Sequence, residues 1–201
     1  KYWIEHGKKY KEQFQYNKRY RLQETILIDY LKSISPFSNV FEIGCGFGRI
    51  TKLLLSNFPD IKEYVAVDIS LDQVENAKVY IREVRQQDTK IQFIVSDIRS
   101  LEIDKKYDLV LASEVLMHIL PSEIDDVILK LVEKSNKHIV NIDWYEERTP
   151  KKVAPHNFIH RYQDIYNDLT SIRKINQIPI LKRGLLLKTI VKQSIFHAVK
   201  G

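Results

Sequence analysis

Three glycines separated by single residues form the stretch of this chain that is best suited to bind a ligand. Gly44, Gly46 and Gly48 follow the strand-forming run Phe41-Glu42-Ile43 and precede a helical pattern that begins at Arg49. Glycine accepts positive φ angles and, because it has no Cβ, lets a ligand lie almost on the backbone. We therefore interpret acid-x-Gly-x-Gly-x-Gly as a strand, a binding turn and a helix.

The spacing of these glycines excludes two familiar binding turns. A dinucleotide-binding turn has the pattern G-x-G-x-x-G, which would place its third glycine or alanine at position 49, where Arg49 stands. A phosphate-binding P-loop needs Gly-Lys-Ser or Gly-Lys-Thr after its glycines, and the chain has no such run. The ligand must therefore be bound in another way.

An acid at the end of the next predicted strand suggests a ribose. Tyr64-Val65-Ala66-Val67 is a short apolar strand pattern that ends in Asp68, and Ser70 begins a capping box for the helix that follows. A carboxylate in this position of an α/β nucleotide-binding fold accepts hydrogen bonds from the two vicinal hydroxyls of a ribose. We predict this role for Asp68. The buried face of the following helix is predicted to consist of Leu71, Val74, Ala77, Ile81 and Val84.

Further strand and helix patterns follow in alternation, with strands at 91–95, 107–113 and 138–142. Ser122 is predicted to cap the helix between the last two strands. Such an alternation predicts a parallel sheet with helices on both faces and with ligands at the carboxyl ends of its strands. The polar residues predicted at those ends are Glu42, Asp68, Asp97, Ser113 and Asp143.

The glycine turn resembles the first motif of the class I S-adenosylmethionine-dependent methyltransferases, and 107–119 resembles their fourth motif. The resemblance covers about residues 20–201. It implies an α/β fold with a doubly wound, seven-stranded, mostly parallel Rossmann-like sheet and an antiparallel C-terminal strand. It also implies that S-adenosylmethionine is the cofactor and S-adenosylhomocysteine the product. The residues expected to bind the cofactor are Glu42, Gly44, Cys45, Gly46, Gly48, Asp68, Ile69, Asp97, Ile98 and Ser113, with Asp97 and Ile98 at the adenine.

The chain is expected to form one domain of 201 residues. Residues 1–35 are predicted to be an N-terminal helical arm, 36–145 the cofactor-binding core, and 146–201 the acceptor-side segment with the closing strands. In that last segment a helix is expected at 162–169 and strands at 171–180 and 194–199, with 184–191 ambiguous between them.

Composition and charge limit the class of protein. With 44% hydrophobic and 29% charged residues, no apolar run long enough for a membrane span and a single cysteine, the chain is expected to be cytoplasmic and free of intrachain disulfides. The net charge of +6 divides into +4 for the arm, −5 for the core and +7 for the last segment. Basic flanks favour an anionic acceptor, although a lysine-rich solvated surface would carry the same charge.

Methyl transfer to a hydroxyl needs a base, and histidine is the natural base near neutral pH. His118, His156 and His160 are the candidates, with Asp143 or Glu114 to orient a histidine or bind the acceptor. The site residues are thus predicted as His156, His118 and Asp143 for catalysis, and Glu114 and His160 for the substrate. The fourth motif lacks the Asn/Asp-Pro-Pro-Tyr/Phe sequence common in amine methylation. The acceptor is therefore expected to be an oxygen of a small molecule or glycan, with carbon still open.

Two alternatives stay open. Glu114, His118 and His156 could bind a metal ion, as in the metal-dependent RNA 2′-O-methyltransferases, but Met117 stands where their motif has its second glutamate. RNA would then be the acceptor. Alternatively, the chain keeps the fold and the cofactor site without activity. No metal is expected under the main interpretation.

Overall fold

The computed structural model describes residues 3–5, 18–84, 88–144, 154–183 and 189–201. Tyr10, Phe14 and Tyr16 of the predicted arm lie outside these residues, while 3–5 are helical. Backbone contacts divide the chain into two units, 1–108 and 109–201, which are described separately below. The single-domain organisation stays a prediction.

The strands form the seven-stranded sheet that the resemblance implied, in the order β3-β2-β1-β4-β5-β7-β6. β7 is antiparallel to both of its neighbours, which confirms the antiparallel C-terminal strand. The seven strands are β1 (Asn39–Ile43), β2 (Glu63–Asp68), β3 (Lys90–Val95), β4 (Tyr107–Ser113), β5 (Ser135–Trp144), β6 (Ile172–Arg183) and β7 (Thr189–Lys200).

In the first unit, β1, β2 and β3 pair in parallel, so their carboxyl ends lie at one edge. Ile43 pairs with Val67, and Asp68 with Val95. β1 and β2 are almost continuously buried, as strands covered on both faces must be. Their apolar side chains form the core of this unit and hold the edge that carries the glycine turn.

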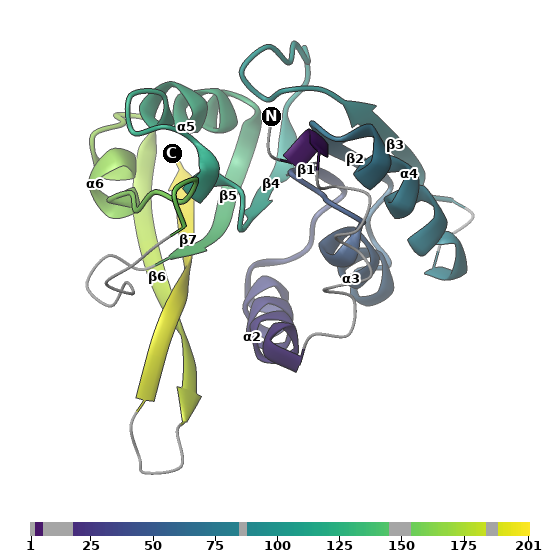
Figure 1. Ribbon diagram of the computed structural model, residues 1–201, viewed down its shortest axis with the longest axis horizontal. Coiled ribbons are helices and arrows are strands. Elements are labelled where there is room, and N and C mark those ends of the chain that lie inside the picture. The colour runs from purple at the N-terminus through teal and green to yellow at the C-terminus, as the bar shows by residue number, and fades with distance from the viewer. Residues whose placement is uncertain (1–2, 6–17, 85–87, 145–153, 184–188) are drawn as a thin grey trace. The chain divides into compact units, whose positions relative to one another are not determined.

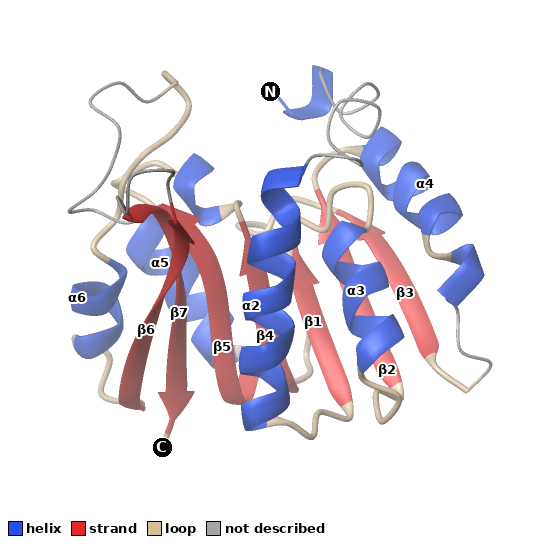
Figure 2. Cartoon of the chain, turned by 90° about the horizontal axis from the view of Figure 1, so that it is seen from below, coloured by secondary structure: helices blue, strands red, loops and turns tan. Residues whose placement is uncertain are grey.

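Beyond the short helical stretch at residues 3–5, the described part of this unit contains α2 (Lys18–Ile34), α3 (Arg49–Asn57) and α4 (Leu71–Tyr80), and a short 3₁₀ turn, Arg82–Val84, follows α4. α2 and α3 lie side by side (Figure 2). Val74, Ala77 and Ile81 are buried as predicted, and Ser70 accepts the capping hydrogen bond from the Gln73 N–H. Leu71, however, is 60% exposed, so its predicted burial was wrong. It is the first residue of α4, at the end of the helix where the chain leaves the sheet edge.

In the second unit, β5, β7 and β6 are joined by antiparallel pairing, and β6 and β7 form a long two-stranded ribbon (Figure 1). β6 runs to Arg183, beyond the predicted end at 180, and β7 begins at Thr189, within the segment that the sequence left ambiguous. The 3₁₀ turn η2 (Leu116–His118), α5 (Ile124–Glu133) and α6 (Tyr162–Asn167) complete the unit. In the described part of the chain, no helix combines the length and the apolar character that crossing a membrane requires.

One predicted cap is absent from α5. The helix begins after Glu123, without a side-chain cap, so Ser122 is not its N-cap. Residues 121–123 instead form a turn, in which the Glu123 N–H donates to the Leu120 carbonyl at 2.9 Å. The predicted apolar face of α5 is confirmed: Ile124, Val127, Ile128, Leu131 and Val132 are all buried.

Candidate functional site

The glycine turn has the conformation that its sequence predicts. Gly44, Gly46 and Gly48 have φ angles of 63°, 54° and 84°, all in the left-handed region that favours glycine. The turn is anchored at the sheet, where the Cys45 N–H donates to the Val67 carbonyl at 3.0 Å. The backbone N–H groups of this turn are therefore held in place beside the ends of β1 and β2.

Gly46 and Gly48 are required for different reasons. A Cβ at Gly48 would lie 3.0 Å from the Cβ of Ala77, so glycine lets α3 and α4 approach each other. A Cβ at Gly46 would meet no atom within 4 Å. The turn thus offers open space at Gly46, which a side chain would fill and which fits the backbone approach expected for a bound methionine moiety. The Cys45 side chain is buried, so this residue can serve a ligand only through its backbone.

Asp68 joins the glycine turn to the start of α4. Its Oδ2 accepts from the Gly46 N–H at 2.9 Å and its Oδ1 from the Ser70 N–H at 2.9 Å. Burial raises the pKa of Asp68, and these backbone donors oppose the rise. Each carboxylate oxygen can accept more than one hydrogen bond, so the fixed carboxylate keeps capacity for the two hydroxyls of a ribose. Ile69, its predicted partner in binding, is partly exposed beside it.

Glu42 lies beneath the turn in a network that sequence reasoning missed. Its Oε2 accepts from Thr51 Oγ1 at 2.5 Å and from the Tyr64 hydroxyl at 2.7 Å. Burial raises the pKa of Glu42 to about 7, although both hydroxyls and Arg49 oppose the rise. Glu42 therefore ties β1 to β2 and α3. Thr51 gave one available signal, since it is a polar residue on the buried face of a helix.

Arg49 is a second missed residue. Its Nη1 lies 3.0 Å from Glu24 Oε1, its Nη2 donates to Gln23 Oε1 at 2.8 Å, and its guanidinium lies 4.0 Å from the centroid of the Tyr20 ring. All three partners belong to α2. Arg49, directly after the glycine turn, thus fastens the turn to this helix. Because Arg49 and Glu24 are 25 residues apart, no local sequence pattern indicated that they pair.

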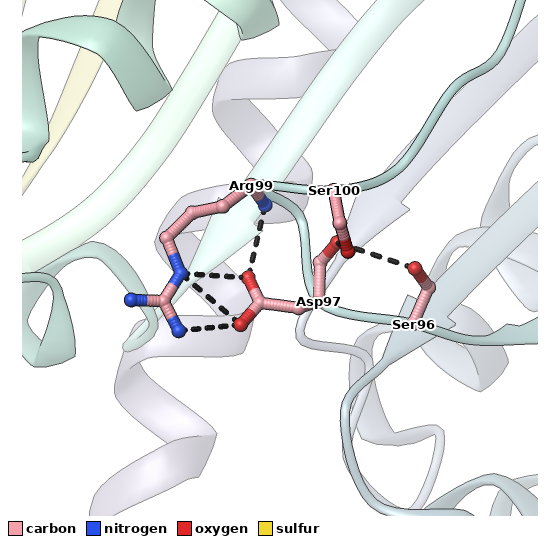
Figure 3. A network of polar contacts seen from close by, with 4 residues as sticks. All are labelled: Ser96, Asp97, Arg99 and Ser100. Carbon is pink, nitrogen blue, oxygen red and sulfur yellow. Dashed lines mark hydrogen bonds and ion pairs between the residues drawn. The ribbon is translucent and has the colours of Figure 1, made fainter.

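Asp97 lies just beyond the end of β3 and is paired with Arg99 (Figure 3). Arg99 Nε lies 2.9 Å from Oδ1, Arg99 Nη2 lies 2.5 Å from Oδ2, and the Arg99 N–H donates to Oδ1 at 2.9 Å. The Ser96 N–H donates to the Asp68 carbonyl at 3.0 Å, which fixes the turn to β2. Asp97 and Ile98 thus lie at the same edge as Asp68, and their role at the adenine stays a prediction.

In the second unit, Glu114 follows β4 in a strained conformation. Its φ is 57°, in a region that residues other than glycine seldom adopt and that is over-represented at functional sites. Its N–H donates to the Ile142 carbonyl at 2.8 Å, and its Oε1 accepts from Gln193 Nε2 at 2.5 Å. The strained residue is therefore held at both its backbone and its side chain. Ser113, before it, is partly buried at the strand end.

His118 and His156 are brought together. Their ring centroids are 5.5 Å apart, and His118 Nδ1 lies 3.1 Å from the His156 carbonyl oxygen. Because a carbonyl can only accept, Nδ1 carries the hydrogen, and in the neutral ring Nε2 has the lone pair. Burial lowers the pKa of His118, while the His156 carbonyl and Glu114 oppose this. The lowered pKa favours the neutral imidazole, in which Nε2 is the unprotonated nitrogen.

His160 and Asp143 instead support the backbone around η2. His160 is buried, and its Nε2 lies 3.1 Å from the Ile119 carbonyl oxygen. Asp143 is fully buried, and its oxygens accept from the Met117 N–H at 3.2 Å and from Asn141 Nδ2 at 2.9 Å. Burial raises the pKa of Asp143 to about 8. These contacts are made within the protein. The predicted roles, catalysis for Asp143 and substrate binding for His160, stay predictions.

The metal alternative needs at least three ligand side chains close together. Across the residues that the structure describes, no three of His, Cys, Asp or Glu come close enough to hold a metal ion, Glu114, His118 and His156 included.

The sequence is similar to a family of methyltransferase domains and to several O-methyltransferases. Residues 41–139 match the family model of a methyltransferase domain. The chain is 32% identical to the malonyl-[acyl-carrier protein] O-methyltransferase of Acetivibrio thermocellus over 95 residues, which are 47% of this chain and 31% of the relative. It is also 32% identical to the ubiquinone biosynthesis O-methyltransferase of Rickettsia akari over 131 residues, 65% of this chain and 49% of the relative. The chain thus spans at most about half the length of these relatives.

Among solved structures, the fold is similar to that of the N-methyltransferase NodS from Bradyrhizobium japonicum WM9 in complex with S-adenosyl-L-homocysteine. The TM-score is 0.73 at 17% identity, over 94% of this chain and 90% of that chain. At this identity the likeness concerns the fold alone.

Proposed function

We propose that this chain is a class I S-adenosylmethionine-dependent methyltransferase that transfers a methyl group from this cofactor to an oxygen atom of a small molecule or glycan, in keeping with the methyltransferase-domain model that residues 41–139 match. The observation that carries the proposal is the contact between Asp68 and Gly46, with 2.9 Å between Oδ2 and the backbone nitrogen. This contact holds the Asp68 carboxylate directly beside the open space at Gly46, which supports a site that takes the ribose and the methionine moiety of one ligand.

The cofactor residues divide the ligand between them. The backbone at Gly44, Gly46 and Gly48 binds the methionine end, with Glu42 ordering the turn from below. Asp68 accepts from the ribose hydroxyls. Asp97 and Ile98 hold the adenine. In support, each of the three acids is fixed by its own donors: hydroxyls for Glu42, backbone N–H groups for Asp68, and Arg99 for Asp97.

We assign the chemistry at the acceptor to Glu114, His118 and His156. When bound, S-adenosylmethionine would supply a methyl group on a sulfonium, and the sulfur would leave as a neutral thioether. As the acceptor oxygen forms its bond to the methyl carbon, it must lose its proton. We assign the base to His118 through Nε2, since Nδ1 is engaged by the His156 carbonyl. His156 and Glu114 then flank the acceptor.

An oxygen acceptor is supported by the O-methyltransferases among the relatives. The +7 charge of residues 146–201 supports an anionic group on the acceptor through electrostatic attraction. The catalytic and substrate roles of His118, His156 and Glu114 are part of this proposal.

Calorimetric titration with S-adenosylmethionine and S-adenosylhomocysteine tests the cofactor site. We expect binding of both, unchanged by a chelator. If neither binds, the chain has kept the fold without the function. Loss of binding or activity after chelation, restored by a divalent metal, would favour the RNA-modifying alternative. Transfer of labelled methyl from the cofactor to hydroxyl-bearing metabolites and glycans, with carboxylate or phosphate groups and without, then tests the acceptor class.

A further inference from the structure

Asn157 carries a buried hydrogen-bond acceptor that has no donor. Its side-chain oxygen, Oδ1, is shielded from solvent and has no hydrogen-bond partner among the residues that the structure describes. Native proteins keep few such atoms, because an acceptor that has lost its water without gaining a donor destabilises the fold. A donor for Asn157 Oδ1 must therefore come from a change in its surroundings, such as the protonation of a neighbouring group.

The backbone on both sides of Asn157 is bound to the turn that carries His118. The His156 carbonyl oxygen lies 3.1 Å from His118 Nδ1, and the Phe158 N–H donates to the Met117 carbonyl at 2.7 Å. These two contacts hold the intervening residue, Asn157, against η2. The orphan acceptor is thus placed beside the candidate base.

The side chain of Asn157 also acts on the charge of the His118 ring. Burial lowers the pKa of His118, and the hydrogen-bonding groups that oppose this are the His156 carbonyl and the Asn157 side chain. The charged neighbours of the ring are His156, which lowers the pKa, and Glu114, which raises it. A hydrogen-bonding group that raises the pKa of a histidine stabilises its protonated form. Asn157 therefore favours the imidazolium over the neutral ring.

Protonation of His118 creates the donor that Asn157 Oδ1 lacks. In the neutral ring Nδ1 carries the hydrogen and faces the His156 carbonyl, while Nε2 has a lone pair. When the ring takes a proton, Nε2 becomes a second donor and Nδ1 keeps its contact with the carbonyl. Hydrogen bonds used in catalysis are often long in an empty site and shorten as the reaction proceeds. Oδ1 without a partner beside the neutral ring fits this behaviour.

We propose that Asn157 is a positioning residue for the base of methyl transfer, and that its Oδ1 accepts a hydrogen bond from His118 Nε2 once the ring has taken the proton of the acceptor hydroxyl. The inference rests on the proposed function, in which His118 is the base. As the acceptor oxygen bonds to the methyl carbon, its proton moves to Nε2 and the ring gains one positive charge. The ring gives this proton to water after the methylated product leaves. Asn157 acts through His118 and need not contact the acceptor.

NMR titration of His118 in the full chain tests the inference without cofactor or acceptor. The resonance of His118 is identified by its loss in His118→Gln. Asn157→Leu keeps much of the side-chain volume but removes the acceptor. His118 should then bind its proton roughly threefold to tenfold more weakly, within the range of coupling between residues in contact. Asn157→Asp puts a negative charge at the same position, so the titration should shift in the opposite direction.

Controls separate this pairing from a structural role. Asn167 is an exposed asparagine at the end of α6, and Asn167→Leu and Asn167→Asp should leave the titration of His118 unchanged. Asn157→Leu should unfold at no lower temperature than the unsubstituted chain, because it removes a buried acceptor without a partner. In single-turnover methyl transfer, Asn157→Leu should be slower than the unsubstituted chain and should have no further effect in a His118→Gln background.

Four results would overturn the inference. An unchanged titration in Asn157→Leu would show that Oδ1 does not accept from His118. Shifts in the same direction for Asn157→Leu and Asn157→Asp would show that position 157 only affects packing around the ring, and a loss of stability in Asn157→Leu would make the amide structural. A shifted titration with an unchanged rate would remove Asn157 from catalysis.

Failure of the proposed function is seen separately. If the unsubstituted chain binds neither S-adenosylmethionine nor S-adenosylhomocysteine, the proposed function fails, and the role of Asn157 in methyl transfer fails with it. If the cofactor binds and the titration of His118 is the same in Asn157→Leu, the inference about Asn157 fails alone.

Discussion

Asp68 Oδ2 accepts a hydrogen bond of 2.9 Å from the backbone N–H of Gly46, across 22 residues of sequence. The acid that is proposed to bind the ribose therefore also fixes the turn that is proposed to bind the methionine end. The two proposed parts of the cofactor site are thus linked through a single carboxylate. Any substitution of Asp68 must be examined for both effects.

Asp68→Ala is expected to weaken binding of S-adenosylhomocysteine by about 1.5 to 3 kcal/mol, the scale of hydrogen bonds to a charged group. An analogue without the ribose 2′- and 3′-hydroxyls separates the two effects, because it can lose only the part due to the turn. Calorimetry with both ligands should therefore show the larger loss for the natural one. Asp72→Ala, an exposed acid in the first turn of α4, is the matched control. Equal affinities in Asp68→Ala and the unsubstituted chain would remove Asp68 from the site.

Substitutions at two glycines of the turn should differ in kind. Gly46→Ala puts a side chain at a φ of 54° but into open space, so it should cost roughly 1–2 kcal/mol of stability and obstruct the cofactor. Gly48→Ala adds a contact of 3.0 Å with Ala77 Cβ to a φ of 84°, so its loss of stability should be larger. Chemical denaturation and calorimetry of both variants check this. Undiminished cofactor binding by Gly46→Ala would contradict the assignment of the open space to the ligand.

Much of the sheet could be predicted because its signals are local. Parallel strands buried on both faces are apolar runs, so β2 and β4 were recognisable, and the predicted bounds of β4 agree with those observed. Left-handed turns need glycine, so the binding turn was equally visible. The acids could be assigned to the strand ends because each lies at or directly after the end of a predicted strand.

The partners of those residues could not be predicted, because they come from distant parts of the chain. Tyr64 reaches Glu42 across 22 residues, Arg49 reaches Glu24 across 25, and Gln193 reaches Glu114 across 79. A pattern along the sequence says which face a side chain lies on, but not which side chain it meets. For the same reason the sequence could not distinguish a histidine such as His118 from His160, whose ring is buried against the backbone of Ile119.

His118→Gln is expected to slow methyl transfer by roughly 10²- to 10⁴-fold, the usual contribution of a general base, without changing affinity for S-adenosylhomocysteine. His156→Ala keeps the carbonyl that orients His118, so its loss of rate should be smaller. Because the pKa of His118 is lowered, the base stays neutral below its ordinary pKa of 6.5, and the rate should fall only as the pH drops further. Single-turnover rates between pH 5 and 8 measure this. Full activity in His118→Gln with none in His156→Ala would transfer the role to His156.

Asp143 should make the stability of the protein depend on pH. Burial raises its pKa to about 8 in the folded chain, whereas an unfolded aspartate has its ordinary pKa near 4. The folded state therefore holds the extra proton between these values. The stability that the protonated group contributes is fully present below about pH 4 and is lost as the pH rises through about 8. The slope for one proton is at most about 1.4 kcal/mol per pH unit.

Asp143→Asn removes this titration and should flatten the dependence of the free energy of unfolding on pH between 5 and 8. The amide nitrogen would face Asn141 Nδ2, which now donates to Asp143 at 2.9 Å, so some stability is lost at every pH and the slope is the quantity to compare. Glu42, whose pKa is raised to about 7, titrates in the same direction and stays in both proteins. Urea denaturation at pH 5, 6.5 and 8, with Asp164→Asn at an exposed position as control, measures the slopes. If the free energy of unfolding depends on pH with the same slope in Asp143→Asn and in the unsubstituted chain, Asp143 is ionised in the folded protein. Met117 and Asn141 would then stabilise its charge.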